Sequence, residues 1–502
     1  MRRLRAVPSV LRLRRGFIAV ALFGVGCGIA AIHLRSFVLL HDEGLALQAA
    51  ARVADGDWPY RDFWWNYGPG QPLLLAALEP LTAGPSLLVW RLLWVVEMAA
   101  AGLLVFLLVR RAAALPWALA AWAAALFLLV AARLPHPHVA VTVLALAALL
   151  LVRTRPAVAG LLAGIAVFFR PELGVFVVAA VVLAAGSSGA RRALAVASVS
   201  SLLLLLPFIV VGGPGRFLGQ TIGFDLSDQH LQRLPLAGSP PAGAGLIDRL
   251  HYRLPLVLIV AAAVAIALVL FSAARKGASG ETLGLALLGT GGAAYLLGRA
   301  DLFHLVPLAA VAPALLALAA TAEGRPRTAP WLCAAALALL LVDGVTRRID
   351  ILDNAAPTAR VPGPAGDGVR TDPATAAALA RIGALLDRQA PGAPIWVANA
   401  RHDRVTSGAT LAYVILDRRN ATRYDVMQPG VVTQRGVQEE IARDLTRRRA
   451  PVVRWLGAAG ALREDSAAAR MSGSKLLDGF LARRYRVFAT VGEWQLLVWS
   501  GR

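Results

Sequence analysis

The residues best suited to chemistry are two adjacent acids that follow directly on an apolar run. Asp42 and Glu43 stand in the stretch HDEG, residues 41–44. Ionisable residues at the edge of lipid are costly and usually have a function there. For a lone acid the alternative is a polar cap that ends a membrane span. The pairing of the acids and the unusual segment after them favour a functional site.

The segment after the acids does not have the composition of an ordinary loop. LALQAAARVADG is amphipathic and helix-prone, which suits a helix lying in the membrane interface. DWPYRDFWWNYGPGQP (57–72) then supplies interfacial aromatic residues together with Arg61 and Asp62. LLLAALEPLTAG (73–84) is too short to span a membrane. We therefore expect an outer loop over 41–86 that contains interfacial helices.

Composition places the chain among polytopic α-helical membrane proteins. Of 502 residues, 58% are hydrophobic and 16% are charged, and the mean hydropathy is +0.63. A soluble domain has about a quarter of its residues charged. About eleven membrane spans are predicted over 17–34, 87–109, 113–132, 138–152, 157–169, 172–186, 193–211, 254–274, 282–298, 302–320 and 329–345.

The basic residues predict the orientation of these spans. The net charge is +21, but the arginines recur in short clusters between apolar runs, which favours cytoplasmic loops over a nucleic-acid surface. Five clusters, from Arg110-Arg111 to Arg325 and Arg327, fall on the same predicted side. The N-terminus resembles a signal peptide but is better interpreted as an uncleaved first span that starts in the cytoplasm. We expect a protein of the plasma or inner membrane with its C-terminal domain outside the cytoplasm.

The polar residues of the other outer loops are further candidates. Arg170 and Glu172 lie in FFRPELG, where a tight turn with a snorkelling arginine is the alternative. Arg299, Asp301 and His304 lie in LGRADLFH (297–304). His136 and His138 lie in a PHPH stretch, which fits a turn better than half of a metal site. The long loop 212–253 adds Asp225, Asp228 and His230.

The C-terminal third has a different composition. We divide the chain into a membrane domain, residues 1–345, a linker, 346–375, and a small α/β domain, 376–502. Strands are predicted at 394–400 and 451–457, a hairpin at 485–500, and a helix at 436–449. Cys27 and Cys333 lie far apart inside apolar segments, so no disulfide and no thiolate metal site is predicted. No cofactor is predicted from the sequence, which leaves a divalent metal open without indicating one.

The acid pair and the segment after it resemble the lipid-linked-sugar-dependent GT-C glycosyltransferases. The pattern DEG…G…PYRDFWWNYGPGQPLLLAAL…G.S…R, from Asp42 to Arg91, is similar to the group of dolichyl-phosphate-mannose–protein mannosyltransferases, aminoarabinose transferases and RgtA-like proteins. The likeness continues more weakly through GLLAGIAVFFRPELG (160–174). NYGPGQP replaces the lysine and paired prolines of some members, which leaves the sugar and the acceptor open.

The resemblance implies a function and roles for the candidate residues. The expected reaction moves a hexose or pentose from a polyprenyl-phosphate carrier to a cell-envelope acceptor, a glycan, lipid or protein, with inversion. Because phosphate leaves readily, the reaction needs a base for the acceptor hydroxyl and cations for the phosphate. Asp42 is the predicted base and Glu43 assists or orients the acceptor. The predicted substrate-binding residues are Tyr60, Arg61, Asp62, Arg170, Glu172, Arg299, Asp301 and His304.

Two other function classes stay open at the level of sequence. A transporter or lipid flippase is the first, although the spans show no paired halves. A non-catalytic envelope scaffold that binds through its C-terminal domain is the second, but it leaves the acid pair unexplained. The expected partners are the lipid-linked donor, the envelope acceptor and membrane lipids, with no nucleic acid.

Overall fold

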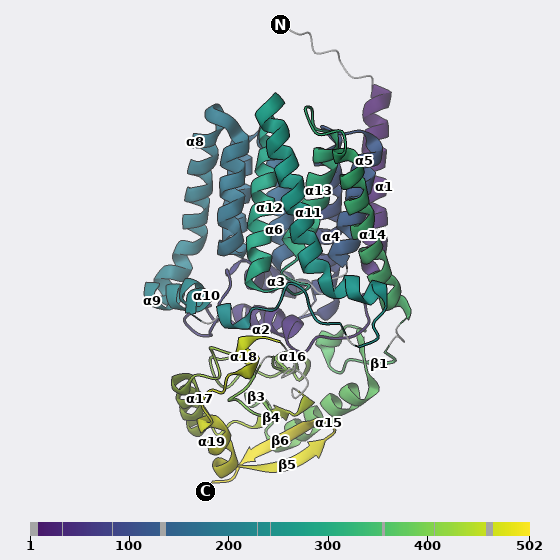
Figure 1. Cartoon of the computed structure of the whole chain (residues 1–502). Coiled ribbons are helices and arrows are strands. Elements are labelled where there is room, and N and C mark those ends of the chain that lie inside the picture. Colours follow the sequence, from purple (N-terminus) through teal and green to yellow (C-terminus); the bar gives the residue numbers. More distant parts are fainter. Residues whose placement is uncertain are drawn as a thin grey trace.

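The chain forms a bundle of long helices with a smaller α/β domain at one end (Figure 1). Both are seen in a computed structural model of the chain. The residues that this structure describes are 9–32, 34–82, 84–130, 137–227, 229–240, 242–353, 357–405, 407–457 and 465–501.

Within the described residues, each of the eleven predicted apolar segments lies mostly in a helix. Two of them, 172–186 and 193–211, lie in α8 (Pro171–Gly212), where two helices meet at a kink at Gly186, with a positive φ of 66°. The bundle helices are α1 (Ser9–Ala31), α4 (Leu87–Arg110), α5 (Leu115–Val130), α6 (Pro137–Leu151), α7 (Pro156–Phe169), α8 (Pro171–Gly212), α11 (Leu246–Lys276), α12 (Gly280–Gly298), α13 (Val306–Thr321) and α14 (Ala329–Asp353).

The composition of these helices is that of a membrane protein. Within the described ranges, four helices, α4, α8, α11 and α14, are long and apolar enough to cross a membrane, and five shorter apolar segments accompany them. Helix α13 packs against α4, α5, α6, α11, α12 and α14. Almost every residue of α13 is buried, as expected for a helix that is hydrophobic on all sides. The number of crossings stays a prediction.

The basic clusters gather at the end of the bundle away from the α/β domain. Arg111, after α4, and Arg153, after α6, lie 4.0 and 2.9 Å from the carboxylate of Glu281 at the start of α12. Gly324, between α13 and α14, packs against the side chain of Lys276 at the end of α11. Helix α1 begins at this same end (Figure 1). The clusters therefore share one face of the bundle, as the alternation of spans predicts.

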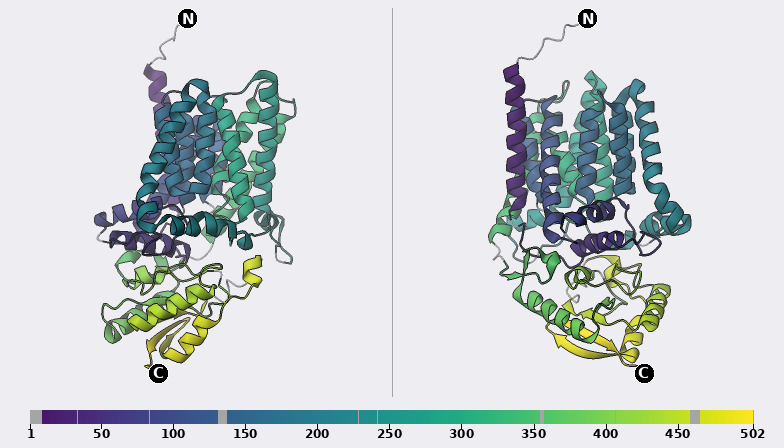
Figure 2. Two further views of the ribbon diagram at one scale, coloured as in Figure 1. Left: turned by 90° about the vertical axis from the view of Figure 1, so that its left-hand side faces the viewer. Right: turned by 180° about the vertical axis from the view of Figure 1, so that it is seen from behind.

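Short helices lie between the bundle and the α/β domain (Figure 2). They are α2 (Asp42–Ala54), α3 (Gly70–Leu78), η1 (Glu79–Leu81), α9 (Pro214–Leu218), η2 (Gly219–Gly223), α10 (Phe224–Ser227) and η3 (Gln229–Gln232). The first three occupy the segments predicted to form interfacial helices. Helix α2 is covered on both sides, and a Cβ atom at Gly44 would lie 2.1 Å from the backbone nitrogen of Leu411. Only glycine permits this approach of the C-terminal domain to α2.

The C-terminal domain contains a four-stranded sheet in the order β3-β4-β6-β5. Strands β3 (Trp396–Asn399) and β4 (Val452–Trp455) are parallel, while β5 (Tyr485–Val491) and β6 (Trp494–Trp499) form the predicted hairpin. The predicted helix is α17 (Arg435–Arg448). The other elements are β1 (Ala359–Arg360), η4 (Pro364–Gly366), β2 (Arg370–Thr371), α15 (Pro373–Gln389), α16 (Leu411–Ile415), α18 (Ala467–Arg470) and α19 (Leu476–Arg484).

The segment predicted as a linker is partly regular. Helix α14 continues to Asp353, eight residues beyond the predicted boundary, because polar residues lower hydropathy without breaking a helix. Helix α15 already begins at Pro373, where the carboxylate of Asp372 accepts a hydrogen bond of 2.7 Å from the backbone of Thr375. An Asp N-cap followed by Pro is a strong start signal for a helix.

Candidate active site

Asp42 lies at the first turn of α2, at the junction of the bundle and the C-terminal domain. Its side chain is partly buried, and its carboxylate has no hydrogen-bond or ion-pair partner among the residues described. Burial raises the pKa of Asp42 above its usual value; His41 opposes this shift and the nearby Asp301 adds to it. A carboxylate of raised pKa is a stronger base than an ordinary aspartate.

His41 and Arg299 complete the immediate surroundings of Asp42. The charge of Arg299 lowers its pKa, and His41 does so only when its imidazole is protonated, although burial prevails. Burial also lowers the pKa of His41, and its Nδ1 atom accepts a hydrogen bond of 3.1 Å from the backbone of Gly408. His41 is therefore held as a neutral imidazole that joins the start of α2 to the C-terminal domain.

Glu43 has a different environment from its neighbour. It is fully buried, and its two carboxylate oxygens accept hydrogen bonds of 2.7 and 2.8 Å from Arg91 of α4. The backbone of Leu39 donates a third, of 3.0 Å. Arg91 also donates to the carbonyls of Leu34 and Phe37. Both oxygens of Glu43 are thus engaged within the protein, and the pair fixes the turn that leads into α2.

Arg170 and Glu172 lie at the junction of α7 and α8, on the side of the bundle that faces the C-terminal domain. Arg170 is 2% exposed. Its Nε atom lies 2.5 Å from Glu172, and its Nη2 atom donates a hydrogen bond of 2.5 Å to the hydroxyl of Tyr295. Its guanidinium lies 4.3 Å from the centre of the Tyr67 ring. Ion pair, hydrogen bond and cation–π contact together hold this guanidinium in place.

Arg299, Asp301 and His304 form a cluster between α12 and α13. Asp301 lies 2.7 Å from Arg299 Nε and 2.7 Å from His304 Nδ1. Its carboxylate also accepts a hydrogen bond of 2.9 Å from the backbone of His304. Burial alone would raise the pKa of Asp301, but His304 and Arg299 bring it below its usual value. Asp301 is therefore an anion at neutral pH, in contrast to the more basic Asp42.

Tyr295 connects the two clusters. Its ring stacks on His304 with 4.8 Å between centroids and lies 5.1 Å from the ring of His138. Its hydroxyl contacts both Arg170 and His138. Five of the predicted residues, Arg170, Glu172, Arg299, Asp301 and His304, thus belong to one network at the end of the bundle.

Tyr60, Arg61 and Asp62 do not join this network. Tyr60 is fully buried, donates a hydrogen bond of 2.6 Å to the carbonyl of Tyr67, and packs edge-on against Phe217. Its hydroxyl is thus hydrogen-bonded within the protein, and its contact with substrate stays a prediction. Arg61 and Asp62 pair at 2.7 Å and line a separate polar cleft of about 1000 Å³.

Most of the remaining outer polar residues cannot be placed in the site. Arg133, His136 and Asp228, and the side chain of Asp225, lie outside the described residues, while His230 is exposed. No group of three or more His, Cys, Asp or Glu side chains suited to a metal ion occurs in the part of the chain that the structure describes.

Sequence reasoning overlooked several residues. Tyr295 precedes Arg299 by one helical turn, a spacing that could have marked it as a neighbour of the outer cluster. Arg91 and Glu43 are 48 positions apart, so no local sequence pattern indicates that they pair. Glu97 was also missed: it lies in the middle of α4, half-buried and without a partner among the described residues. A carboxyl inside a span often has a function.

Comparison with models of protein families and with curated protein sequences finds no match. The solved structures that are similar to this chain include the following two. The crystal structure of the oligosaccharyltransferase of Archaeoglobus fulgidus in the apo form is 12% identical, with a TM-score of 0.47, over 87% of this chain and 69% of that one. The cryo-EM structure of a mutant of the arabinofuranosyltransferase AftD from Mycobacteria is 15% identical, with a TM-score of 0.49, over 96% of this chain. This chain spans 41% of that protein.

Proposed function

We propose that this chain is a GT-C-type membrane glycosyltransferase. It transfers a sugar from a polyprenyl-phosphate carrier to a cell-envelope acceptor, with inversion at the anomeric carbon. The observation that carries the proposal is the unpartnered, basic carboxylate of Asp42 beside the arginines and histidine of the Tyr295 network. A base next to fixed cations is the set of groups that this reaction needs.

The proposed reaction is a single displacement. The acceptor hydroxyl oxygen attacks the anomeric carbon, and the bond from that carbon to the phosphate oxygen breaks. The phosphate leaves on its lipid with the bonding electron pair, while Asp42 takes the hydroxyl proton. Arg170 and Arg299 are the proposed phosphate contacts, with His304 as a further donor. Their carboxylate partners, Glu172 and Asp301, keep these groups oriented before substrate arrives.

Glu43 is proposed as a positioning residue. Since both of its oxygens are bound to Arg91, it acts on the reaction through the placement of α2 and hence of Asp42. Arg61 and Asp62 are proposed to contact substrate from the separate cleft, at a distance from the phosphate.

The proposed orientation places the C-terminal domain outside the cytoplasm and the N-terminus inside. The gathering of Arg111, Arg153 and Lys276 at the opposite end of the bundle supports it. The reaction then takes place on the outer face of the plasma or inner membrane, where a lipid-linked donor and an envelope acceptor meet.

Replacement of Asp42 by Asn tests the proposal. The variant keeps the size of the side chain and loses the ability to accept a proton. We expect transfer of labelled sugar from polyprenyl-phosphate sugar, by membranes that contain the variant, to slow by about 10²–10⁴-fold, or about 3–5 kcal/mol of barrier. The amount of inserted protein should match the wild type. Near-normal transfer would remove the main support for the enzyme assignment.

A transporter or lipid flippase is the second candidate, favoured by Glu97 inside α4. This function predicts that lipid-linked sugar moves across the membrane of vesicles that contain the protein and that no glycosylated product forms. It also predicts that Glu97→Gln abolishes this transport and that Asp42→Asn leaves it unchanged. The transferase predicts the reverse effects of the two variants on activity.

A further inference from the structure

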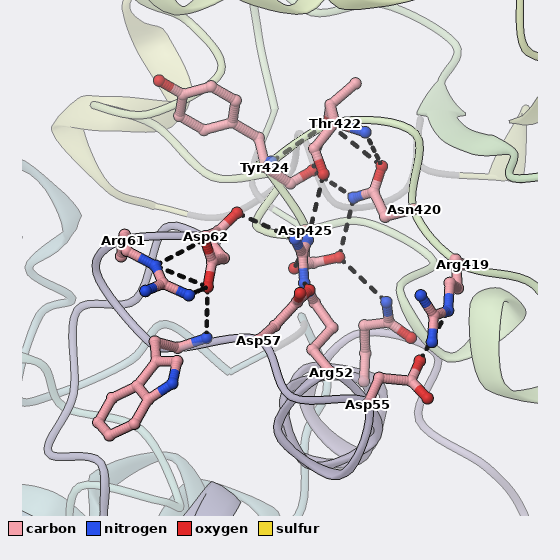
Figure 3. Close-up of polar contacts among 12 residues, drawn as sticks. Arg52, Asp55, Asp57, Arg61, Asp62, Arg419, Asn420, Thr422, Tyr424 and Asp425 are labelled. Atoms are coloured by element: carbon pink, nitrogen blue, oxygen red, sulfur yellow. Dashed lines mark hydrogen bonds and ion pairs between the residues drawn. The ribbon is translucent and has the colours of Figure 1, made fainter. Parts of the chain in front are cut away.

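A polar cleft lies on the C-terminal half of α2, between that helix and the C-terminal domain. It has a volume of about 1000 Å³. One wall is formed by α2 and the loop that follows it, and it includes Arg52, Asp55 and Arg61. The other wall is formed by residues 413–423 and by α17. Figure 3 shows the two walls, with Arg52 of α2 pointing to Thr422 and Asp425 of the domain. Neither Asp42 nor Arg170 lines the cleft.

The charges that line the cleft are balanced. Eight arginines and eight carboxylates contribute to the lining. Many are already paired: Arg52 with Asp57 at 2.8 Å, Arg61 with Asp62 at 2.7 Å, Arg419 with Asp55 at 2.9 Å and Arg447 with Asp444 at 2.9 Å. An anionic ligand would have to displace carboxylates from these four arginines, and among the described residues only Arg216 and Arg448 of the lining lack a carboxylate partner. A neutral ligand rich in hydroxyl groups can donate to the carboxylates and accept from the guanidinium groups without breaking the pairs.

The walls of the cleft are fixed by buried hydrogen bonds. Arg52, whose side chain is 12% exposed, lies 3.1 Å from Asp425 and donates to the backbone carbonyls of Thr422 and Asp62. Asn420 donates to Asp425 at 2.8 Å and so joins the same network. A site whose polar groups are ordered in advance loses less entropy when it binds a flexible chain.

Size and position indicate which substrate this cleft accommodates. Ligand sites measure about 300–1000 Å³, so this cleft has room for more than a single sugar unit. Gln48, at its near end, is six residues from Asp42, or about 9 Å along the helix. We propose that the cleft binds a neutral oligosaccharide, the glycan part of the acceptor, and directs its end toward Asp42. This inference rests on the proposed transferase function.

A binding measurement on the full chain in lipid nanodiscs tests the inference. The probe is an array of defined neutral and anionic oligosaccharides, followed by titration with the neutral oligosaccharide that is best retained. The cleft variant is the double change Arg419→Ala and Arg447→Ala. Its matched control is Arg435→Ala and Arg470→Ala, which removes two exposed, paired arginines that do not line the cleft. Thermal unfolding of each protein checks the fold.

We expect neutral oligosaccharides to bind the wild type and the control equally well. The cleft variant should bind at least about tenfold more weakly, since it loses hydrogen bonds from two charged groups to the ligand. Retention of no array member, retention of anionic members alone, or equal binding by the cleft variant and the control would each overturn the inference.

The donor is absent from this assay, so the two proposals fail separately. Asp42→Asn protein should bind the oligosaccharide as the wild type does. If the wild type binds the oligosaccharide but transfers no sugar, the transferase proposal fails and the proposal for the cleft does not. If the cleft variant transfers sugar with an unchanged KM for the acceptor, only the proposal for the cleft fails.

Discussion

At the scale of single residues, the adjacent acids Asp42 and Glu43 differ in the partners of their carboxyl groups. One is unpartnered and more basic than usual, while the other is bound by an arginine. Because burial raises the pKa of Asp42, the proposed base is ionised only at a pH above that of an ordinary aspartate. We expect the transfer rate to fall as pH drops through this raised pKa and to level off above it. Initial rates across pH measure this, and a rate independent of pH down to the ordinary aspartate range would contradict it.

Glu43 gives a second prediction at this scale. Glu43→Gln leaves the Arg91 charge buried without its counter-ion, which typically costs about 3–5 kcal/mol. We expect a lower unfolding temperature in detergent and slower transfer, because the start of α2 is no longer fixed. The double variant Glu43→Gln and Arg91→Met removes the uncompensated charge and should recover most of the stability. If the double variant is stable but inactive, Glu43 or Arg91 takes part in the reaction itself.

At the scale of elements, η1 brings a carboxyl against the end of α2. Burial, with a contribution from Asp55, raises the pKa of Glu79 to about 7. The folded state therefore holds a proton that the unfolded chain releases near its ordinary pKa. This residue makes stability fall as pH rises from that ordinary pKa to about 7, and its effect levels off above the folded-state pKa. Glu79→Gln should flatten that dependence, measured as unfolding temperature between pH 5 and about 8. An unchanged slope would show that Glu79 does not cause it.

The elements also show what sequence can and cannot predict. Alternating and helical periodicity predicted β3, β4, the hairpin and α17, because these patterns are local. The end of α14 was placed too early because hydropathy falls before the helix ends. Tyr60 was assigned to substrate because it lies among polar and aromatic residues, and its burial by packing was not predicted. The contacts of Glu43 with Arg91, and of Tyr295 with Arg170 and His138, join distant segments and depend on packing.

At the scale of the whole molecule, the orientation of the bundle determines where the reaction takes place. A reporter that fluoresces only in the cytoplasm, fused after Asp353 at the end of α14, should stay dark, because the proposed orientation places the basic clusters of the other end in the cytoplasm. The same reporter placed between Arg153 and Arg155 should be bright and serves as the control. A bright fusion after Asp353 would invert the orientation and place the Asp42 site inside the cell.

The burial of α2 beneath the C-terminal domain has a consequence for biogenesis. Helix α2 is synthesised early, but its contacts with Gly408, Leu411 and Asp425 come from segments made more than 350 residues later. In the proposed orientation, the nascent chain therefore carries Asp42 across the membrane long before the C-terminal groups that cover α2 exist. The site would then assemble only after the last third of the chain has reached the same side as α2. If the chain is the proposed transferase, its activity is tied to correct insertion, and a truncated or inverted product would be inactive without any separate quality-control step.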